Sequence, residues 1–193
     1  YWDMYDPEKL QLAANPFPPK NIKRYALTNF GELRGYYGMP KGNKPVSNEH
    51  ARHLINGYYA CVSFIDAQIG LILDALESEG LKDNTIVIIL GDHGFQLGEH
   101  NLWSKYTLFE QSTRVPLLVR VPGRMRNSAA CDEIVELVDL VPTLCELLEM
   151  PQPGNIEGTS FVPLLRRPKQ PWKKAAFTVC SIAGYVGRSV RPK

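Results

Sequence analysis

The sequence lacks the cysteine patterns that organise a small zinc domain or a disulfide-rich domain. Four cysteines occur in 193 residues, at positions 61, 131, 145 and 180. None forms a Cys-x-x-Cys pair or another metal-ligand spacing, which argues against a zinc site built on cysteine. Cys61 and Cys145 fall among apolar residues of expected helices, and we expect both to be small core residues.

An excess of charge of one sign and a long hydrophobic run are missing too. The net charge is +2 and the basic residues are scattered, so we expect no nucleic-acid partner. No apolar run reaches the roughly 18 residues that a membrane crossing requires, so we expect no membrane span. The chain starts without methionine and stops after a strand-like segment, so we expect it to be part of a longer protein.

Proline and aromatic residues divide the chain into three expected parts. Residues 1–46 are rich in proline and aromatic side chains, which predicts a loop-rich segment pinned onto a larger body. Residues 47–150 alternate helical and strand-like patterns, which predicts an α/β domain. Residues 151–193 begin with an irregular, proline-rich connection and end in two strand-like segments, 175–180 and 185–190.

A long helix followed by a buried strand is the clearest pattern in the central part. Ser47 or Asn48 supplies an N-cap, apolar residues then recur at helical spacing, and Gly80 ends the helix. The continuously apolar run 85–90 is typical of a strand covered on both faces of a mostly parallel sheet. Further strands are expected at 115–122 and 134–138, and a second helix opens at Asp139 and Pro142.

The segment from Gly91 to Lys105 is the most informative part of the sequence. Asp92 and His93 follow strand 85–90 directly, and ligands in such sheets bind beyond the carboxyl ends of the strands. A carboxylate and an imidazole together suit a divalent cation that also has oxygen ligands from elsewhere. In the alternative interpretation, Asp92 caps the turn and His93 is a hydrogen-bonded core residue.

Two further side chains of this segment are candidates for the same site. Lys105 returns to the pocket if Gly98 turns the chain back, and its ammonium there neutralises an anion held by the metal. The alternative for Lys105 is a surface lysine whose stem packs on Trp103. His100 is a candidate for proton transfer, or else a supporting residue that orients the turn.

The order of these motifs resembles the second half of the catalytic domain of the type I sulfatases, within the alkaline phosphatase superfamily. The resemblance is carried by Asp-His-Gly at 92–94, Leu-Gly-Glu-His at 97–100, Trp-x-Lys at 103–105, Arg-Val-Pro-Leu-Leu-Val at 114–119 and Val-Pro-Gly at 121–123. It extends through 58–66, 138–144 and 158–165 to 187–191, the strand that opens the family's smaller C-terminal subdomain. The Asp-His form of the metal pair is most similar to iduronate 2-sulfatases.

The resemblance implies an α/β fold with a mixed, mostly parallel sheet flanked by helices, incomplete in this chain. It implies a sulfate ester hydrolase acting on a sulfated saccharide, with Ca²⁺, or alternatively Mn²⁺ or Mg²⁺, held partly by Asp92 and His93. Lys105 matches the lysine that holds the substrate sulfate, and His100 takes a supporting role. The nucleophile of this family is a formylglycine hydrate made from cysteine.

The family's nucleophile signature, Cys-x-Pro/Ala-x-Arg, surrounds none of the four cysteines. We therefore expect this chain to be the C-terminal portion of a sulfatase, inactive alone and completed by an N-terminal half of the same protein. A phosphonate monoester or phosphodiester hydrolase of the same superfamily, and a non-catalytic binding module, remain alternatives. The resemblance also implies an extracytoplasmic location: periplasmic, secreted or lysosomal.

Overall fold

The computed structural model describes residues 1–27, 31–42, 44–123, 129–182 and 184–193. Two compact units are present. The first comprises Tyr1–Asn84 and Ile88–Leu118, and the second comprises Thr85–Val87 and Val119–Lys193.

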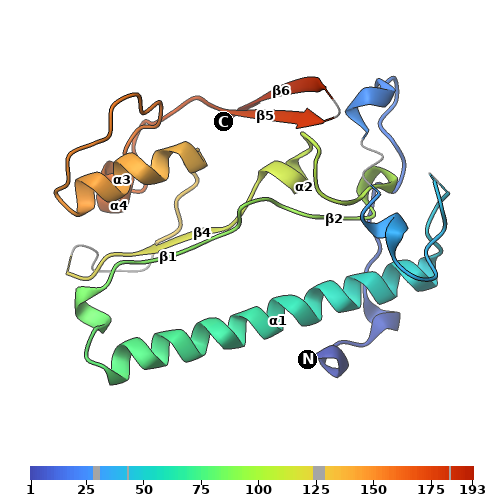
Figure 1. The fold of residues 1–193 in the computed structure, drawn as a ribbon, viewed down its shortest axis with the longest axis horizontal. Helices are drawn as coiled ribbons and strands as arrows, with labels where there is room; N and C mark the ends of the chain where they lie inside the picture. The colour runs from blue at the N-terminus through green and yellow to red at the C-terminus, as the bar shows by residue number, and fades with distance from the viewer. Residues whose placement is uncertain (28–30, 43, 124–128, 183) are drawn as a thin grey trace. The chain divides into compact units, whose positions relative to one another are not determined.

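Helix α1 (Asn48–Ser78) dominates the first unit and runs without interruption (Figure 1). It begins where predicted, because the Ser47 hydroxyl accepts a hydrogen bond from the His50 amide and so caps the first turn. Ala51 and Ile55 bury one side of its N-terminal end against Leu33 and Trp103. This cluster ties the loop-rich segment to the helix.

The rest of α1 exposes a long apolar surface. By length and composition alone α1 could cross a membrane, a test that the core helix of a soluble protein also passes. The sequence analysis found no continuous apolar run in this helix, because small and weakly polar residues separate the apolar ones. Charged residues are nonetheless rare: Asp66 is the sole charged residue between Leu54 and Leu73. The exposed large side chains include Tyr58, Tyr59, Val62, Phe64, Ile65, Leu71 and Ile72.

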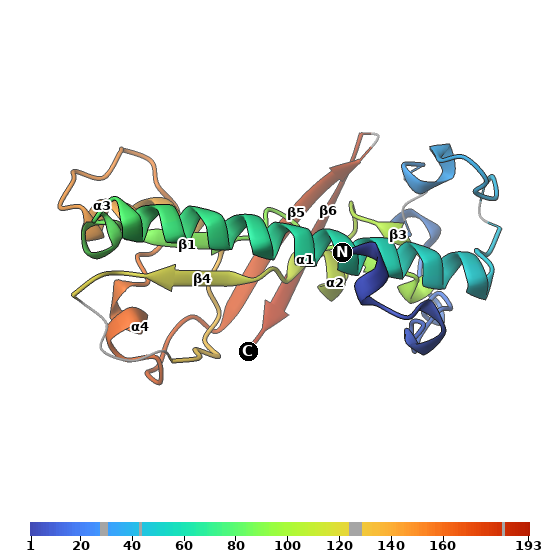
Figure 2. The same ribbon diagram turned by 90° about the horizontal axis from the view of Figure 1, so that it is seen from below.

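Five short segments of the described chain before β1 are 3-10 helices. They are η1 (Trp2–Met4), η2 (Pro7–Lys9), η3 (Arg24–Ala26), η4 (Leu33–Gly35) and η5 (Lys82–Asn84). Beyond η5, strand β1 (Val87–Leu90) pairs with β4 (Leu117–Arg120), and the two lie side by side in Figures 1 and 2. The prediction of a strand buried on both faces is wrong for this chain, because β1 is half-buried and Leu90 is exposed.

A small hairpin follows β1 in the first unit. Strand β2 (Gln96–Leu97) pairs antiparallel with β3 (Trp103–Ser104), and η6 (Glu99–Asn101) lies in the turn between them. Helix α2 (Glu110–Thr113) then leads to β4. Gln96 is fully buried and donates a hydrogen bond to the Thr107 hydroxyl at 3.1 Å, which fixes the hairpin to the chain before α2.

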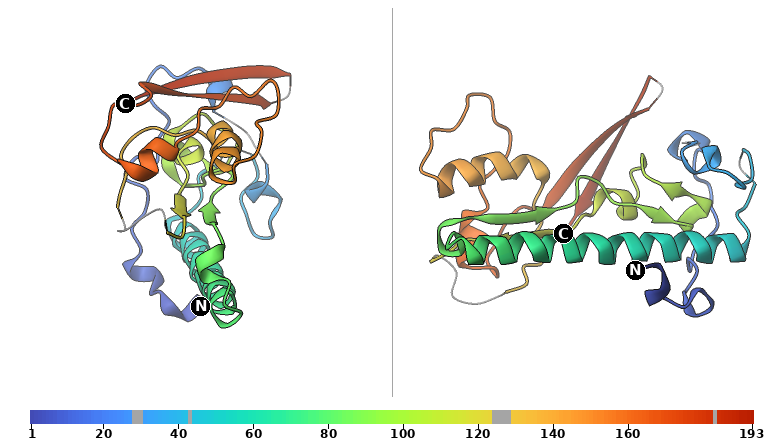
Figure 3. Two further views of the ribbon diagram at one scale, coloured as in Figure 1. Left: turned by 90° about the vertical axis from the view of Figure 1, so that its left-hand side faces the viewer. Right: turned by 60° about the horizontal axis from the view of Figure 1, so that its bottom comes forward.

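The second unit contains η7 (Leu137–Asp139), α3 (Leu140–Leu147), α4 (Val162–Arg166) and the hairpin β5 (Ala175–Ile182) with β6 (Tyr185–Pro192). The hairpin is antiparallel, as Figure 3 shows, with Ala175 opposite Pro192. Its two strands and α3 were predicted from the sequence. Val121, Leu147 and Val162 form the buried core of this unit.

The prediction of a strand at 134–138 is wrong. The chain forms η7 there, because a capping box closes it: the Asp139 carboxylate accepts from the Glu136 amide at 2.9 Å. Helix α4 also differs from the sequence analysis, which expected irregular chain between 154 and 171. Cys145 is buried as predicted, whereas Cys61 is exposed on α1 and the prediction of a core position is wrong for this chain.

Candidate metal and anion site

Asp92 and His93 lie on the bend that follows β1, as the sequence analysis expected. The Gly91 amide donates to the Pro116 carbonyl oxygen at 3.1 Å, and the Gly94 amide donates to the Ser112 carbonyl oxygen at 2.9 Å. These two backbone bonds hold both ends of the bend against the chain that leads into β4. The acid and the imidazole are thus presented from a fixed piece of backbone.

Glycine is required at position 94 for space and not for an unusual backbone angle. A Cβ atom there would lie 1.9 Å from the Gln111 carbonyl oxygen, a distance that no side chain tolerates. Neither Gly91 nor Gly94 has a positive φ, so close approach of the neighbouring chain is the physical reason.

The side chains of Asp92 and His93 face one another. The Asp92 Oδ2 atom lies 3.7 Å from the His93 Nε2 atom, and 85% of the Asp92 side chain and 40% of the His93 side chain are exposed. The His93 Nδ1 atom lies 2.9 Å from the Gly94 carbonyl oxygen. A carbonyl oxygen only accepts, so Nδ1 carries the hydrogen and the neutral ring keeps the Nε2 lone pair free for a metal.

This pair fits part of a cation site. A carboxylate oxygen and an imidazole nitrogen within 3.7 Å of each other can contact one divalent ion. Among the described residues, no group of three or more His, Cys, Asp or Glu side chains is placed to hold a metal. Any ion bound by Asp92 and His93 therefore needs further ligands other than the His, Cys, Asp and Glu side chains of the described residues.

Lys105 directly follows the hairpin that reverses the chain after Asp92 and His93. Gly98 adopts a φ of +111° and its amide donates to the Leu102 carbonyl oxygen at 3.0 Å, which closes the turn as the sequence predicted. Gln96 pairs with Ser104, the last residue of β3, and Lys105 is the first residue beyond that strand.

Lys105 has a partner that the sequence analysis missed. Its Nζ atom lies 3.4 Å from the Glu32 Oε2 atom, and the Ser104 hydroxyl donates to the same oxygen at 3.1 Å. Glu32 lies in the loop-rich segment, 72 residues before Ser104, so no local pattern connected them. The alternative of a surface lysine is disfavoured, because the Lys105 side chain is 25% exposed and pairs with Glu32.

His100 is held by the loop-rich segment. Its amide donates to the Asn15 carbonyl oxygen at 2.7 Å, and its Nδ1 atom lies 3.3 Å from the Phe17 carbonyl oxygen. The imidazole also stacks on the Phe109 ring at a centroid distance of 4.4 Å. These contacts favour a supporting role over proton transfer.

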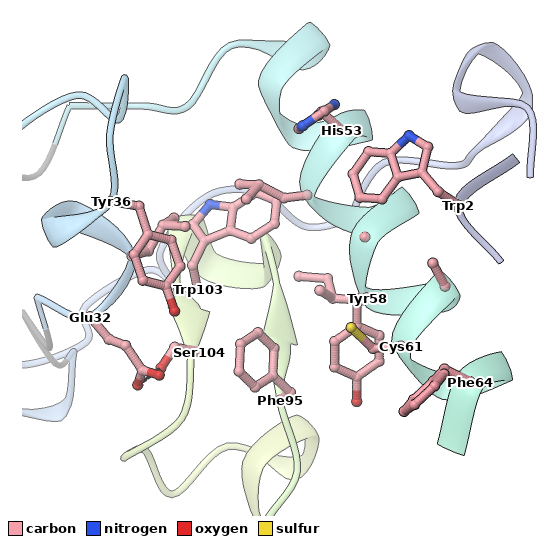
Figure 4. Close-up of a pocket in the computed structure, with 15 residues that line it drawn as sticks. Trp2, Glu32, Tyr36, His53, Tyr58, Cys61, Phe64, Phe95, Trp103 and Ser104 are labelled. Atoms are coloured by element: carbon pink, nitrogen blue, oxygen red, sulfur yellow. Dashed lines mark hydrogen bonds between the residues drawn. The ribbon is translucent and has the colours of Figure 1, made fainter. Parts of the chain in front are cut away.

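An apolar pocket of about 550 Å³ lies beside Glu32 and Ser104 (Figure 4). Tyr58 and Phe95 stack across it, with ring centroids 5.2 Å apart. At its other end the Trp2 ring packs over Gly57, where a Cβ atom would lie 3.1 Å from it. The pocket joins α1, the hairpin and the loop-rich segment within the first unit.

Solved structures similar to this chain include phosphonate monoester hydrolases and sulfatases. The phosphonate monoester hydrolase from Silicibacter pomeroyi matches 92% of this chain and 36% of its own, with a TM-score of 0.76 and 27% identity. The structure of BT4656 with its substrate D-glucosamine-2-N,6-O-disulfate matches 75% of this chain and 31% of its own, with a TM-score of 0.70 and 29% identity. They confirm the expected alkaline-phosphatase-like α/β class.

The chain belongs to the sulfatase family, whose model matches residues 15–150. The iduronate 2-sulfatase of the mouse, Mus musculus, is 32% identical over 189 residues, which cover 82% of this chain and 34% of the mouse protein. The chain thus spans about a third of the length of the relatives it matches. The matched range includes all of α1.

Proposed function

We propose that this chain forms the metal-holding and anion-holding wall of a sulfate ester hydrolase that acts on a sulfated sugar. The observation that supports the proposal is the hairpin of β2 and β3, which reverses the chain between His93 and Lys105 and pairs Gln96 with Ser104. A metal cation and an ammonium together suit a sulfate ester, which is an anion and develops further negative charge on its oxygens as it is cleaved. Similarity to the mouse iduronate 2-sulfatase supports a sulfated uronate as the substrate class.

Each residue then has a distinct task. Asp92 and His93 hold a Ca²⁺ ion, with Mn²⁺ or Mg²⁺ as alternatives, through one carboxylate oxygen and the free Nε2 lone pair. The bound ion would polarise the sulfate oxygens. Lys105 contributes a positive charge where negative charge develops during cleavage, and His100 keeps the hairpin turn against the loop-rich segment.

The nucleophile is proposed to come from outside these 193 residues. The family's formylglycine arises from a cysteine signature that none of the four cysteines has. An N-terminal half of the same protein would supply this group and the remaining metal ligands. We therefore propose that the chain alone is inactive and that the whole protein works in an extracytoplasmic compartment, as its resemblance to the family implies.

The assay compares two substrates of the full-length protein: a disaccharide sulfated on its uronate and an aryl phosphonate monoester. Release of sulfate with the higher kcat/KM supports the proposal. Preference for the phosphonate supports the second candidate, a phosphonate monoester hydrolase, which the structural match to the Silicibacter pomeroyi enzyme favours. Turnover of neither substrate would leave the non-catalytic alternative standing and reject both enzymes.

Removing either metal ligand should weaken Ca²⁺ binding by the full-length protein. We expect Asp92→Asn and His93→Ala each to raise the Ca²⁺ dissociation constant at least about tenfold, since changes even outside the ligand shell cost this much. Calorimetric titration of metal-free protein measures the constant. Asp74→Asn, which changes an exposed carboxylate on α1, is the matched control. An unchanged constant in both ligand variants would remove the pair from the metal site.

The exposed apolar surface of α1 is the proposed contact with the N-terminal half. Cys61, Ile65 and Ile72 share one helical face, and Ile65 and Ile72 are 53% and 63% exposed. In the native full-length protein we expect Cys61 to resist a thiol reagent and to react after unfolding in urea. Mass spectrometry of the labelled peptide gives the rate. Equally fast labelling before and after unfolding would show that this face stays uncovered.

A further inference from the structure

We propose that Glu32 is a positioning residue that fixes the Lys105 ammonium in the anion site. This inference rests on the proposed function, because it assigns Lys105 to the substrate. The Glu32 Oε2 atom lies 3.4 Å from the Lys105 Nζ atom and accepts a hydrogen bond from the Ser104 hydroxyl at 3.1 Å. One carboxylate oxygen therefore holds two consecutive residues of the hairpin.

The position of Glu32 is itself fixed by packing. Leu33, the next residue, is 6% exposed and belongs to the core cluster with Ala51, Ile55 and Trp103. Trp103 directly precedes Ser104, so the contact between Leu33 and this cluster holds Glu32 alongside the start of the Ser104–Lys105 pair. Figure 4 shows Glu32 and Ser104 together at one end of the pocket.

The residues on both sides of Lys105 have strained backbone conformations that neighbouring contacts must stabilise. Ser104 has a φ of +80° and Tyr106 a φ of +66°, both in the left-handed region that non-glycine residues rarely adopt. Strained residues of this kind persist where surrounding contacts hold them, and they cluster at functional sites. The bond between the buried Ser104 hydroxyl and Glu32 is one contact that holds the strained turn.

Pairing with Glu32 leaves Lys105 able to bind an anion. An ammonium has three hydrogens to donate, and the contact with Glu32 engages one of them. The Lys105 side chain is 25% exposed, so part of it remains accessible. An unpaired lysine has a flexible four-carbon side chain. The hydrogen bond to Glu32 restricts that side chain in advance, which reduces the conformational entropy that Lys105 would otherwise lose when it binds the anion.

The test uses Glu32→Gln in the full-length protein, which keeps an acceptor for Ser104 and removes the charge that holds Lys105. We expect kcat to fall on the order of tenfold to a hundredfold, because a misplaced group costs this much. Competitive inhibition by inorganic sulfate should not weaken, since loss of a carboxylate near an anion removes repulsion. If Glu32 had only a structural role, Glu32→Gln would lower both kcat and the affinity for inorganic sulfate.

Three comparisons complete the design. Glu77→Gln is the matched control, because Glu77 also pairs with a lysine, Lys82, at 2.6 Å, and it should leave kcat unchanged. In a Lys105→Ala background, Glu32→Gln should lower kcat no further, since both act through one ammonium. If Glu32→Gln fails to fold, Glu32→Asp, which keeps the charge on a shorter stem and so moves it away from Lys105, should lower kcat by a smaller factor.

Two results would overturn the role of Glu32: an unchanged kcat in Glu32→Gln, or full additivity with Lys105→Ala. If the wild-type protein turns over the aryl phosphonate and not the sulfate ester, the proposed function fails. The same split between kcat and sulfate inhibition is then measured with the phosphonate. Failure of the proposed function and failure of this inference are thus separate outcomes.

Discussion

Lys105→Ala in the full-length protein is expected to lower kcat/KM for a sulfate ester by about 10²-fold to 10³-fold. The size follows from removing one preorganised group that stabilises developing negative charge. We expect both turnover and substrate affinity to fall, because the ammonium contacts the substrate before and during cleavage. Steady-state kinetics at saturating Ca²⁺ measures both constants.

Two further variants show whether the charge or its position matters. Lys82→Ala removes a lysine of η5 that pairs with Glu77 near the C-terminal end of α1, and it should leave the kinetics unchanged. Lys105→Arg keeps the charge but replaces a compact ammonium with a planar guanidinium, and it should restore part of the activity. Wild-type kinetics in Lys105→Ala would remove this residue from the site.

Lys173→Met is expected to lower the free energy of unfolding by about 3 kcal/mol, because it leaves a buried carboxylate without its counterion. Asp139 is fully buried, and the Lys173 ammonium donates to its Oδ1 and Oδ2 atoms at 2.7 and 2.8 Å. The same ammonium donates to Glu136 at 2.8 Å. Urea unfolding of the full-length protein, followed with a spectroscopic probe in the second unit, measures this decrease in the free energy of unfolding.

Lys174→Met is the matched control, because Lys174 is the next residue and is exposed. We expect it to change the unfolding free energy by no more than about 0.5 kcal/mol. Equal effects of the two substitutions would show that the buried pair contributes nothing specific.

The contribution of Lys173 should also depend on pH. Burial lowers the pKa of Lys173, but hydrogen bonds and charge from Asp139 and Glu136 outweigh it, so the folded-state pKa is raised above the ordinary value of 10.5. A raised pKa stabilises the fold below the unfolded value, and this stability is lost as pH rises through the folded value. The difference between wild type and Lys173→Met should therefore shrink above about pH 10.5.

Long-range periodicity made α1 and the terminal hairpin predictable. Thirty-one residues of helical spacing behind a serine cap leave little ambiguity, and alternating strands around a short turn leave almost as little. The segment 134–138 was mistaken for a strand because its apolar residues outweighed the acids three residues apart at Glu136 and Asp139. That spacing is a helix-start signal, and it was present in the sequence.

The site was predictable only where its residues are close in sequence. Asp92, His93 and Lys105 lie within one motif, so a strand end and a glycine turn in the sequence were enough to propose them for one site. Glu32 was not predictable, because its contact with Ser104 spans 72 residues and depends on where Leu33 packs. The half-burial of β1 and the exposure of Cys61 were missed for a related reason: the sequence pattern describes the environment in a complete domain, which this chain spans only in part.

A crystal structure of the full-length protein with Ca²⁺ and inorganic sulfate tests the central claim most directly. The account predicts anomalous density for one Ca²⁺ ion in contact with the Asp92 carboxylate and the His93 Nε2 atom, and a sulfate in contact with the Lys105 ammonium. An ion and a sulfate bound at other residues, with Asp92, His93 and Lys105 left in contact with solvent, would contradict it.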